Sequence, residues 1–166
     1  SERKYLLRAT PPIRHGAEIW KIEQGYLPPA SADGQSLDDG MTLGRLRRVT
    51  TPDGSITCYH TIKQGIGMVR SEIEREIPQE IFERHWPRTQ HCRLRKTRYR
   101  VRQGQAVWEI DVFDDLDLVL GEIELPAADA AVTIPPWLAP FIDREVTNDL
   151  AYTNSSIAAR ISAVSP

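Results

Sequence analysis

The sequence predicts an α+β fold dominated by antiparallel strands, with a few helices beside them. Charged residues recur two positions apart on one segment after another, which is the side-chain period of a β-strand. The residues between them are largely apolar, so each strand has one charged face and one apolar face that must be covered. The charged sets are Glu2/Lys4, Arg45/Arg47, Arg70/Glu72/Glu74, Lys96/Arg98, Glu109/Asp111 and Glu122/Glu124, with Lys63 alone on a further segment.

Two arrangements satisfy this alternation. In the first, an open antiparallel sheet lies under helices and turns its charged face to water. In the second, the sheet closes into a barrel whose interior is lined by the charged side chains, while the apolar side chains pack outward against helices. For any single segment the first arrangement is favoured, because charged strand faces are common. Recurrence on so many segments moves the interpretation toward a shared polar interior.

Eight segments combine this alternation with Gly, Pro or polar turn residues at their ends, and each is predicted to be a strand. Pro11-Pro12 ends the first segment and Pro28-Pro29 ends the second. Thr51-Pro52-Asp53-Gly54 has the composition of a β-turn, which makes the third and fourth segments a hairpin. The tight link Gln103-Gly104 joins the sixth to the seventh. The segments are residues 2–9, 18–27, 42–49, 55–63, 68–77, 92–102, 105–113 and 118–125.

Three helices and one long loop complete the expected elements. Pro78 suits the first position of a helix over 78–86. A short helix is expected at 127–131, and a last helix over 148–161 carries an apolar stripe. Residues 30–40 contain Asp, Ser and Gly with almost nothing apolar, so we expect a mobile loop there that could gate a site.

Length and composition predict one domain over residues 1–166, which is long enough to bury about two thirds of its unfolded surface. The 21 basic and 23 acidic residues give a net charge of -2, which argues against a protein that coats nucleic acid. Cys58 and Cys92 stand in unrelated contexts, so we expect reduced thiols. No apolar run approaches the ~20 residues that span a bilayer, which predicts a soluble, cytoplasmic protein without a membrane partner.

The crowded charges indicate metal and phosphate chemistry. Two like charges about 4 Å apart repel by roughly 4 kcal/mol at an effective dielectric near 20, so clustered carboxylates need a cation or protons. Carboxylates suit Mg²⁺ or Mn²⁺ held together with phosphate oxygens, and arginine forks match phosphate two oxygens at a time. The sequence has no Gly-rich phosphate loop and no nucleophile motif, so side chains would have to bind any phosphate.

Nine short stretches match the motifs of one protein family, in the family's own order. They are Glu2-Arg3-Lys4-Tyr5-Leu6, Gln24-Gly25-Tyr26-Leu27, Arg45-Leu46-Arg47, Thr61-Ile62-Lys63, Arg70-Ser71-Glu72-Ile73-Glu74, Lys96-Thr97-Arg98-Tyr99-Arg100, Trp108-Glu109-Ile110-Asp111, Glu122-Ile123-Glu124-Leu125 and Arg144-Glu145-Val146-Thr147-Asn148-Asp149. On these motifs the chain resembles the triphosphate tunnel metalloenzymes, or CYTH domains, which include thiamine triphosphatases, tripolyphosphatases and class IV adenylate cyclases. The resemblance implies an eight-stranded antiparallel closed barrel, a tunnel with a charged interior and flanking helices.

The resemblance also implies a role for each charged set. The carboxylates similar to the family's ligands for Mg²⁺ or Mn²⁺ are Glu2, Glu122, Glu124 and Asp111. The lysines similar to those that position or activate the attacking water are Lys4 and Lys96. The residues similar to triphosphate ligands are Arg45, Arg47, Lys63, Arg70 and Arg98, with Tyr26 near the tunnel mouth and Glu72 and Glu74 lining the same interior. The first Glu of the family's E-x-E-x-K signature would precede Ser1, and we expect weaker metal binding if the natural protein lacks it.

We therefore expect a metal-dependent hydrolase of a small triphosphate, either inorganic tripolyphosphate or a nucleoside or thiamine triphosphate. Two alternatives stay open at this point. The same tunnel could orient ATP for a cyclase reaction. It could also hold polyphosphate or a nucleotide without turnover, in a module fused to a partner domain in the full-length gene. The sequence does not distinguish the substrate's organic part or the oligomeric state.

Overall fold

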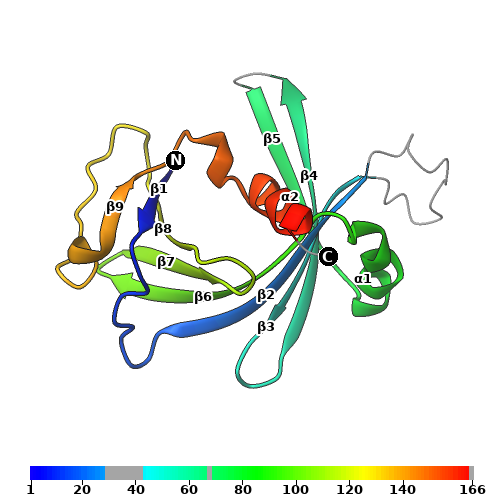
Figure 1. The fold of residues 1–166 in the computed structure, drawn as a ribbon, viewed down its shortest axis with the longest axis horizontal. Coiled ribbons are helices and arrows are strands. Elements are labelled where there is room, and N and C mark those ends of the chain that lie inside the picture. The colour runs from blue at the N-terminus through cyan, green and yellow to red at the C-terminus, as the bar shows by residue number, and fades with distance from the viewer. Residues whose placement is uncertain (29–42, 67–68, 165–166) are drawn as a thin grey trace. The chain divides into compact units, whose positions relative to one another are not determined.

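The computed structural model describes residues 1–28, 43–66 and 69–164, with side chains described for these ranges except at 64–70. The predicted loop at 30–40 lies outside the described residues. Figure 1 shows the elements. The described strands are β1 (Glu2–Leu7), β2 (Glu18–Leu27), β3 (Gly44–Thr50), β4 (Ile56–Ile66), β5 (Val69–Ile77), β6 (Arg93–Gln103), β7 (Ala106–Phe113), β8 (Val119–Glu124) and β9 (Ile142–Glu145). The described helices are α1 (Gln79–His85) and α2 (Asn154–Val164), with short 3-10 turns η2 (Trp86–Thr89), η3 (Ala139–Phe141) and η4 (Leu150–Tyr152).

The strands form an antiparallel sheet in the order β5-β4-β3-β2-β6-β7-β8-β1-β9. The prediction of an antiparallel, strand-dominated α+β fold is confirmed. The prediction of eight strands is wrong, because β9 adds a ninth. The prediction of a closed barrel is also wrong in terms of hydrogen bonding, because no described ladder joins the two end strands β5 and β9. Backbone closure is a non-local property that strand alternation cannot report.

Three local expectations need correction. The four residues of β9 escaped prediction because Ile142–Glu145 is short and mostly charged, and it becomes a strand by pairing with β1. The helix expected at 127–131 is a turn, in which the Ala130 N–H donates to the Ala127 carbonyl over 3.1 Å. The last helix begins at Asn154 rather than at 148, because η4 precedes it.

The chain divides into two compact units, which are described separately. Unit 1 contains residues 1–21 and 95–153, and unit 2 contains residues 22–94 and 154–166. The expectation of one domain over 1–166 stays a prediction. None of the helices in the described residues is long and apolar enough to cross a membrane.

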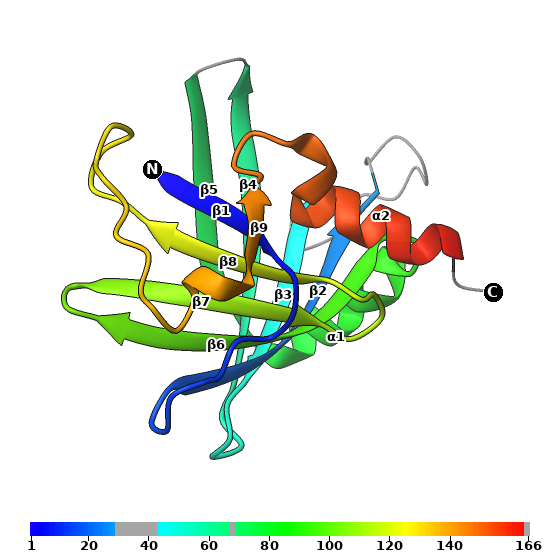
Figure 2. The ribbon, with the colours of Figure 1, turned by 60° about the vertical axis from the view of Figure 1, so that its left-hand side comes forward.

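In unit 1, the sheet has one apolar face and one charged face. Strands β6, β7 and β8 run side by side (Figure 2), and the apolar face carries Tyr5, Trp108, Ile110 and Ile123. Leu138 and other apolar residues of the segment after β8 cover this face. Because strand side chains alternate, burying this face leaves the charged residues of the predicted sets together on the other one.

Unit 2 repeats the pattern on β3, β4 and β5. Leu46 and Cys58 lie on the apolar face, which packs against Phe82 of α1. The Phe82 ring stacks on Trp86 with 4.9 Å between ring centroids. Pro78 stands just before α1, as the sequence predicted for the start of that helix. Helix α1 therefore covers one face of this sheet, which also carries Arg48, whose guanidinium lies 4.9 Å from the centroid of the Phe82 ring. The predicted site residues of β3, β4 and β5 share the opposite face.

Candidate functional site

The register of unit 1 places the predicted acidic and basic residues in rows across neighbouring strands. Glu2 lies opposite Glu124, and Lys4 lies opposite Glu122. Glu122 of β8 also lies opposite Glu109 of the neighbouring strand β7. Side chains that face each other across an antiparallel pair share one face of the sheet. The motif residues at the two ends of this unit's sequence therefore meet on a single surface.

Lys4 is held between a carboxylate and a backbone carbonyl. Its Nζ lies 3.4 Å from Glu122 Oε1 and donates to the Tyr152 carbonyl over 2.9 Å. The Lys4 backbone is also fixed, since its N–H donates to Thr147 Oγ1 and its carbonyl accepts from the Val146 N–H. The segment after β9 thus orients this ammonium group. The two residues are 148 positions apart, and a backbone carbonyl leaves no signal in residue identity that could predict the contact.

Glu2 stands in a crowded acidic setting. Its pKa is raised from 4.5 to about 7, first because surrounding protein atoms desolvate the carboxyl and second because the Glu122 charge repels it, although Lys4 acts the other way. Glu124 contributes a smaller repulsion. A raised pKa on paired carboxylates indicates negative charge that is not fully compensated.

A buried ion-pair cluster lies next to these carboxylates on β6 and β7. Asp111 accepts from Lys96 Nζ over 2.8 Å, from Arg98 Nε over 2.8 Å and from Arg98 Nη2 over 3.0 Å. All three side chains are buried. Burial alone would raise the pKa of Asp111, but Lys96 and Arg98 hold it well below its usual range. Burial alone would lower the pKa of Arg98, yet the Asp111 charge raises it overall.

The positions of Asp111 and Lys96 bear on two predicted roles. Both Asp111 oxygens already accept hydrogen bonds from cations, which leaves this carboxylate little capacity for a metal. The Lys96 ammonium is fully buried and lies 5.4 Å from the centroid of the Phe113 ring. The metal-ligand role of Asp111 and the water-activating role of Lys96 stay predictions.

In unit 2, Arg45, Thr61 and Glu74 form a row on one face. Arg45 Nη2 lies 3.3 Å from Glu74 Oε1 and donates to Thr61 Oγ1 over 3.2 Å. Its Nε is buried and hydrogen-bonds to no described residue. A buried charged donor without an acceptor is costly, so an anion arriving at this position would be stabilised.

A second arginine in unit 2 is positioned by Gln24, a motif residue to which the sequence analysis assigned no role. Arg47 Nε donates to Gln24 Oε1 over 2.8 Å, and Gln24 Nε2 donates to Tyr26 Oη over 2.9 Å. Gln24 is completely buried. Burial also raises the pKa of the Tyr26 hydroxyl, so this group stays neutral. Gln24 lies two positions before Tyr26 on β2, and that spacing was the one signal in the sequence that both share a face.

The remaining predicted residues of unit 2 lie on β4 and β5. Lys63 is exposed and stands opposite Glu72 in the register. Glu72 and Glu74 are both exposed. Arg70 belongs to β5, but its side chain lies outside what the structure describes.

The predicted site residues therefore gather as two sets, one in each unit. The set of unit 1 is Glu2, Lys4, Lys96, Arg98, Asp111, Glu122 and Glu124. The set of unit 2 is Tyr26, Arg45, Arg47, Lys63, Arg70, Glu72 and Glu74. Within the described ranges, no three His, Cys, Asp or Glu side chains come together in a ready metal centre.

Comparison with known proteins connects this chemistry to a family. No family model matches the chain. It is 35% identical over 155 residues to the inorganic triphosphatase of Nitrosomonas europaea, which covers 85% of this chain and 98% of that protein. It is 37% identical over 106 residues to the inorganic triphosphatase of Acetivibrio thermocellus, with 60% of this chain and 64% of that protein covered. The crystal structure of the inorganic triphosphatase NE1496 matches with a TM-score of 0.62 and 30% identity, over 95% of this chain and 96% of the other. The chain belongs to the inorganic triphosphatase family.

Proposed function

We propose that this protein is a hydrolase that cleaves inorganic triphosphate with the help of Mg²⁺ or Mn²⁺, as a triphosphate tunnel metalloenzyme of the CYTH type. The observation that carries the proposal is that the predicted acidic and basic site residues share one face of the sheet in each unit, in a chain similar to named triphosphatases. On β1 and β8 of unit 1, the set consists of the carboxylates Glu2, Glu122 and Glu124 and one lysine, Lys4. Arginines and a lysine dominate the set in unit 2. A metal-bound phosphate chain needs both kinds of partner.

The chemistry of Glu2 and Glu122 fits a divalent cation that the substrate helps to bind. Mg²⁺ is usually held by one or two carboxylates together with waters and substrate phosphates, so a centre of three protein carboxylates is not required. Burial first and the Glu122 charge second raise the pKa of Glu2, and a divalent cation beside the two carboxylates would offset that repulsion. Glu124, opposite Glu2, is a third candidate ligand. When bound, the metal would neutralise phosphate charge and polarise the phosphorus centre.

Arginines and one exposed lysine are assigned to the phosphates. In unit 2, Arg45 offers its buried Nε, and Gln24 fixes the orientation of the Arg47 guanidinium. Lys63 has an exposed ammonium group, which gives a compact point charge. In unit 1, Arg98 is fixed by Asp111 and also lies 3.4 Å from Glu109. Arg70 completes the assigned set through the sequence motif.

Lys4 is assigned to the attacking water. Its ammonium group is oriented by the Tyr152 carbonyl and the Glu122 carboxylate, beside the carboxylates assigned to the metal. A cation at this position would hold a water through its oxygen and stabilise the charge that develops on the terminal phosphate. Lys96 is buried and donates to Asp111, so its contribution would be to keep Arg98 and Asp111 in position rather than to transfer a proton.

Phosphate release tests the proposal. Tripolyphosphate, ATP and thiamine triphosphate are incubated with the protein and Mg²⁺, Mn²⁺ or a chelator. We expect metal-dependent release from tripolyphosphate that Lys4→Ala abolishes. Lys21→Ala is the matched control, because Lys21 is also a lysine of unit 1, and its exposed side chain donates to Thr97 Oγ1 over 3.0 Å. Cyclic AMP from ATP, or binding without any release, would overturn the assignment as a triphosphatase.

A further inference from the structure

Glu109 and Arg100 stand in two of the family-like motifs but have been given no role so far. Arg100 of β6 lies opposite Glu109 of β7, in the row next to the pair of Arg98 with Asp111. On its other side, Glu109 lies opposite Glu122 of β8. Side chains that face each other across an antiparallel ladder share one face of the sheet. Both residues therefore belong to the charged face of unit 1 that carries the residues assigned to hydrolysis.

The guanidinium of Arg98 has one nitrogen that Asp111 does not occupy. Asp111 accepts from Nε over 2.8 Å and from Nη2 over 3.0 Å. Within the described part of the chain, Nη1 donates no hydrogen bond, and it lies 3.4 Å from Glu109 Oε2. Both N–H groups of Nη1 are therefore available to a phosphate oxygen.

The Glu109 carboxylate competes with a phosphate for this nitrogen. Both groups are negatively charged, and both are acceptors for the same N–H groups. Like charges that approach one nitrogen repel each other, so a phosphate binds there more weakly if Glu109 is also drawn to it. The affinity of Arg98 for a phosphate therefore depends on what else holds Glu109.

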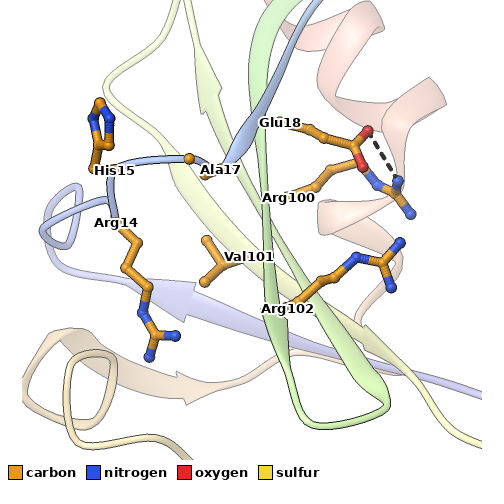
Figure 3. Close-up of a pocket in the computed structure, with 8 residues that line it drawn as sticks. Arg14, His15, Ala17, Glu18, Arg100, Val101 and Arg102 are labelled. Atoms are coloured by element: carbon orange, nitrogen blue, oxygen red, sulfur yellow. Dashed lines mark hydrogen bonds and ion pairs between the residues drawn. The ribbon is translucent and has the colours of Figure 1, made fainter.

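Arg100 is the residue that holds Glu109. Its Nε donates to Glu109 Oε2 over 3.0 Å, whereas the distance from the same oxygen to Arg98 Nη1 is 3.4 Å. Arg100 is itself anchored, because its Nη1 lies 3.4 Å from Glu18 Oε2, an ion pair that Figure 3 shows. Its guanidinium also lies over the Trp20 ring, 4.7 Å from the centroid. These contacts reduce the freedom of Arg100 and fix the position of its hydrogen bond to Glu109.

The next arginine of β6 lacks these contacts. Figure 3 shows that Arg100 and Arg102 leave one side of the strand and that Val101 leaves the other. Arg102 is exposed, and it makes no hydrogen bond or ion pair with a residue that the structure describes. Its partner in the register is the uncharged Val107. Arg102 therefore has the charge of Arg100 on the same face, without the contact to Glu109.

We propose that Arg100 and Glu109 are a positioning pair that keeps Arg98 available to the triphosphate. Arg100 holds the Glu109 carboxylate by a hydrogen bond, so Nη1 of Arg98 can donate to a phosphate oxygen. Glu109 keeps its bond to Arg100 when the phosphate binds, and its charge stays compensated. Both residues act through Arg98 and do not contact the substrate. The inference rests on the proposed function, which assigns Arg98 to the phosphates.

A double-mutant cycle on tripolyphosphate binding tests the pair. Isothermal titration calorimetry in the presence of a chelator measures the dissociation constant without turnover, and the KM with Mg²⁺ should follow the same order. Arg100→Gln should raise the dissociation constant about threefold to fivefold, the range for a partly exposed ion pair, because Arg98 is then the cation paired with Glu109. Glu109→Gln should lower it by a similar factor, because the competing charge is gone. The double variant should bind as Glu109→Gln does.

Arg102→Gln is the matched control, since it removes the same charge from the same face of β6. Its dissociation constant should stay within about twofold of wild type. An equal loss of affinity in Arg102→Gln would show that only the total charge matters and would overturn the inference. A loss caused by Arg100→Gln that persists in the Glu109→Gln background would make Arg100 a phosphate ligand itself. Weaker binding by Glu109→Gln would also contradict the pair.

The outcomes separate this inference from the proposed function. A protein that shows the expected cycle in binding but releases no phosphate with Mg²⁺ or Mn²⁺ refutes the hydrolysis and leaves the positioning pair standing. Metal-dependent release without coupling between the two positions refutes the pair and leaves the hydrolysis standing. A wild-type protein that does not bind tripolyphosphate with chelator or with Mg²⁺ overturns both.

Discussion

Replacing Asp111 by Asn tests the buried ion-pair cluster directly, because the two side chains have nearly the same shape and differ in charge. The variant removes the anion that Lys96 and Arg98 share and leaves Arg98 only the longer contact of 3.4 Å with Glu109. The exposed fractions of the Lys96 and Arg98 side chains are 0% and 8%. Removing one partner from a buried pair typically destabilises a protein by about 3–5 kcal/mol, since the remaining charge is buried and uncompensated. The amide nitrogen of Asn cannot accept a hydrogen bond, so at least one of the three hydrogen bonds of 2.8 to 3.0 Å to Lys96 and Arg98 is lost as well.

Urea unfolding at neutral pH measures this effect as a fall in the midpoint at constant slope. Asp115→Asn is the matched control. Asp115 pairs with Arg95 of the same strand β6 at 3.1 Å, but their side chains are 36% and 58% exposed. We expect a change within about 1 kcal/mol for this exposed pair. If Asp111→Asn also stayed within about 1 kcal/mol of wild type, the cluster would not be the strong buried interaction that its geometry indicates.

The same cluster predicts a direction of pH dependence. The pKa of Asp111 is held below its ordinary value of 3.8 by Lys96 and Arg98, despite burial. Its contribution to the free energy of unfolding is therefore complete above about pH 4 and is lost as the pH falls toward the lowered pKa. Acid unfolding followed by circular dichroism should show this loss in wild type. Asp111→Asn should lack that part of the acid dependence.

Three further predictions concern the charged faces. The pKa of Glu2 is about 7 in the folded protein against an ordinary 4.5, so the metal-free protein should lose stability as the pH rises from about 4.5 through 7. Glu2→Gln should remove this trend in thermal melts. An unchanged trend would contradict the assignment. Lys63→Ala should raise the KM for tripolyphosphate with little change in melting temperature, because the side chain is exposed; an unchanged KM would exclude Lys63 as a phosphate ligand. Gln24→Leu removes the buried amide that accepts from Arg47 Nε, so urea unfolding should show a loss of about 1–3 kcal/mol and kinetics a higher KM. Gln90→Leu, at an exposed position, should change neither.

Alternation along the chain predicted much of the fold. The strand 18–27 coincides with β2, and the hairpin around residues 51–54 joins β3 to β4. Lys4 lies opposite Glu122, and Arg98 lies opposite Asp111. Both pairs agree with the charged face that the two-residue spacing indicated. These features are local, because a strand's two faces follow from the side-chain direction of successive residues.

Other features depend on contacts between residues far apart in sequence. β9 is a strand because β1 offers it an edge, and its four residues carry too little pattern to indicate this. The Tyr152 carbonyl that orients Lys4 is a backbone group, which leaves no trace in residue identity. Gln24 became a positioning residue because burial directed its amide toward Arg47 and Tyr26.

The sequence by itself determined which residues share a charged face, and the motifs it contains indicated triphosphate chemistry. Only the tertiary structure decided which charges compensate each other. In the tertiary structure, Asp111 pairs with Lys96 and Arg98. Glu2 lies beside Glu122 and has a raised pKa, and the Nε of Arg45 is buried without a described acceptor. The physical reason is that spacing fixes the direction of a side chain, whereas its charge partners and its exposure depend on the register and packing of strands from distant parts of the chain.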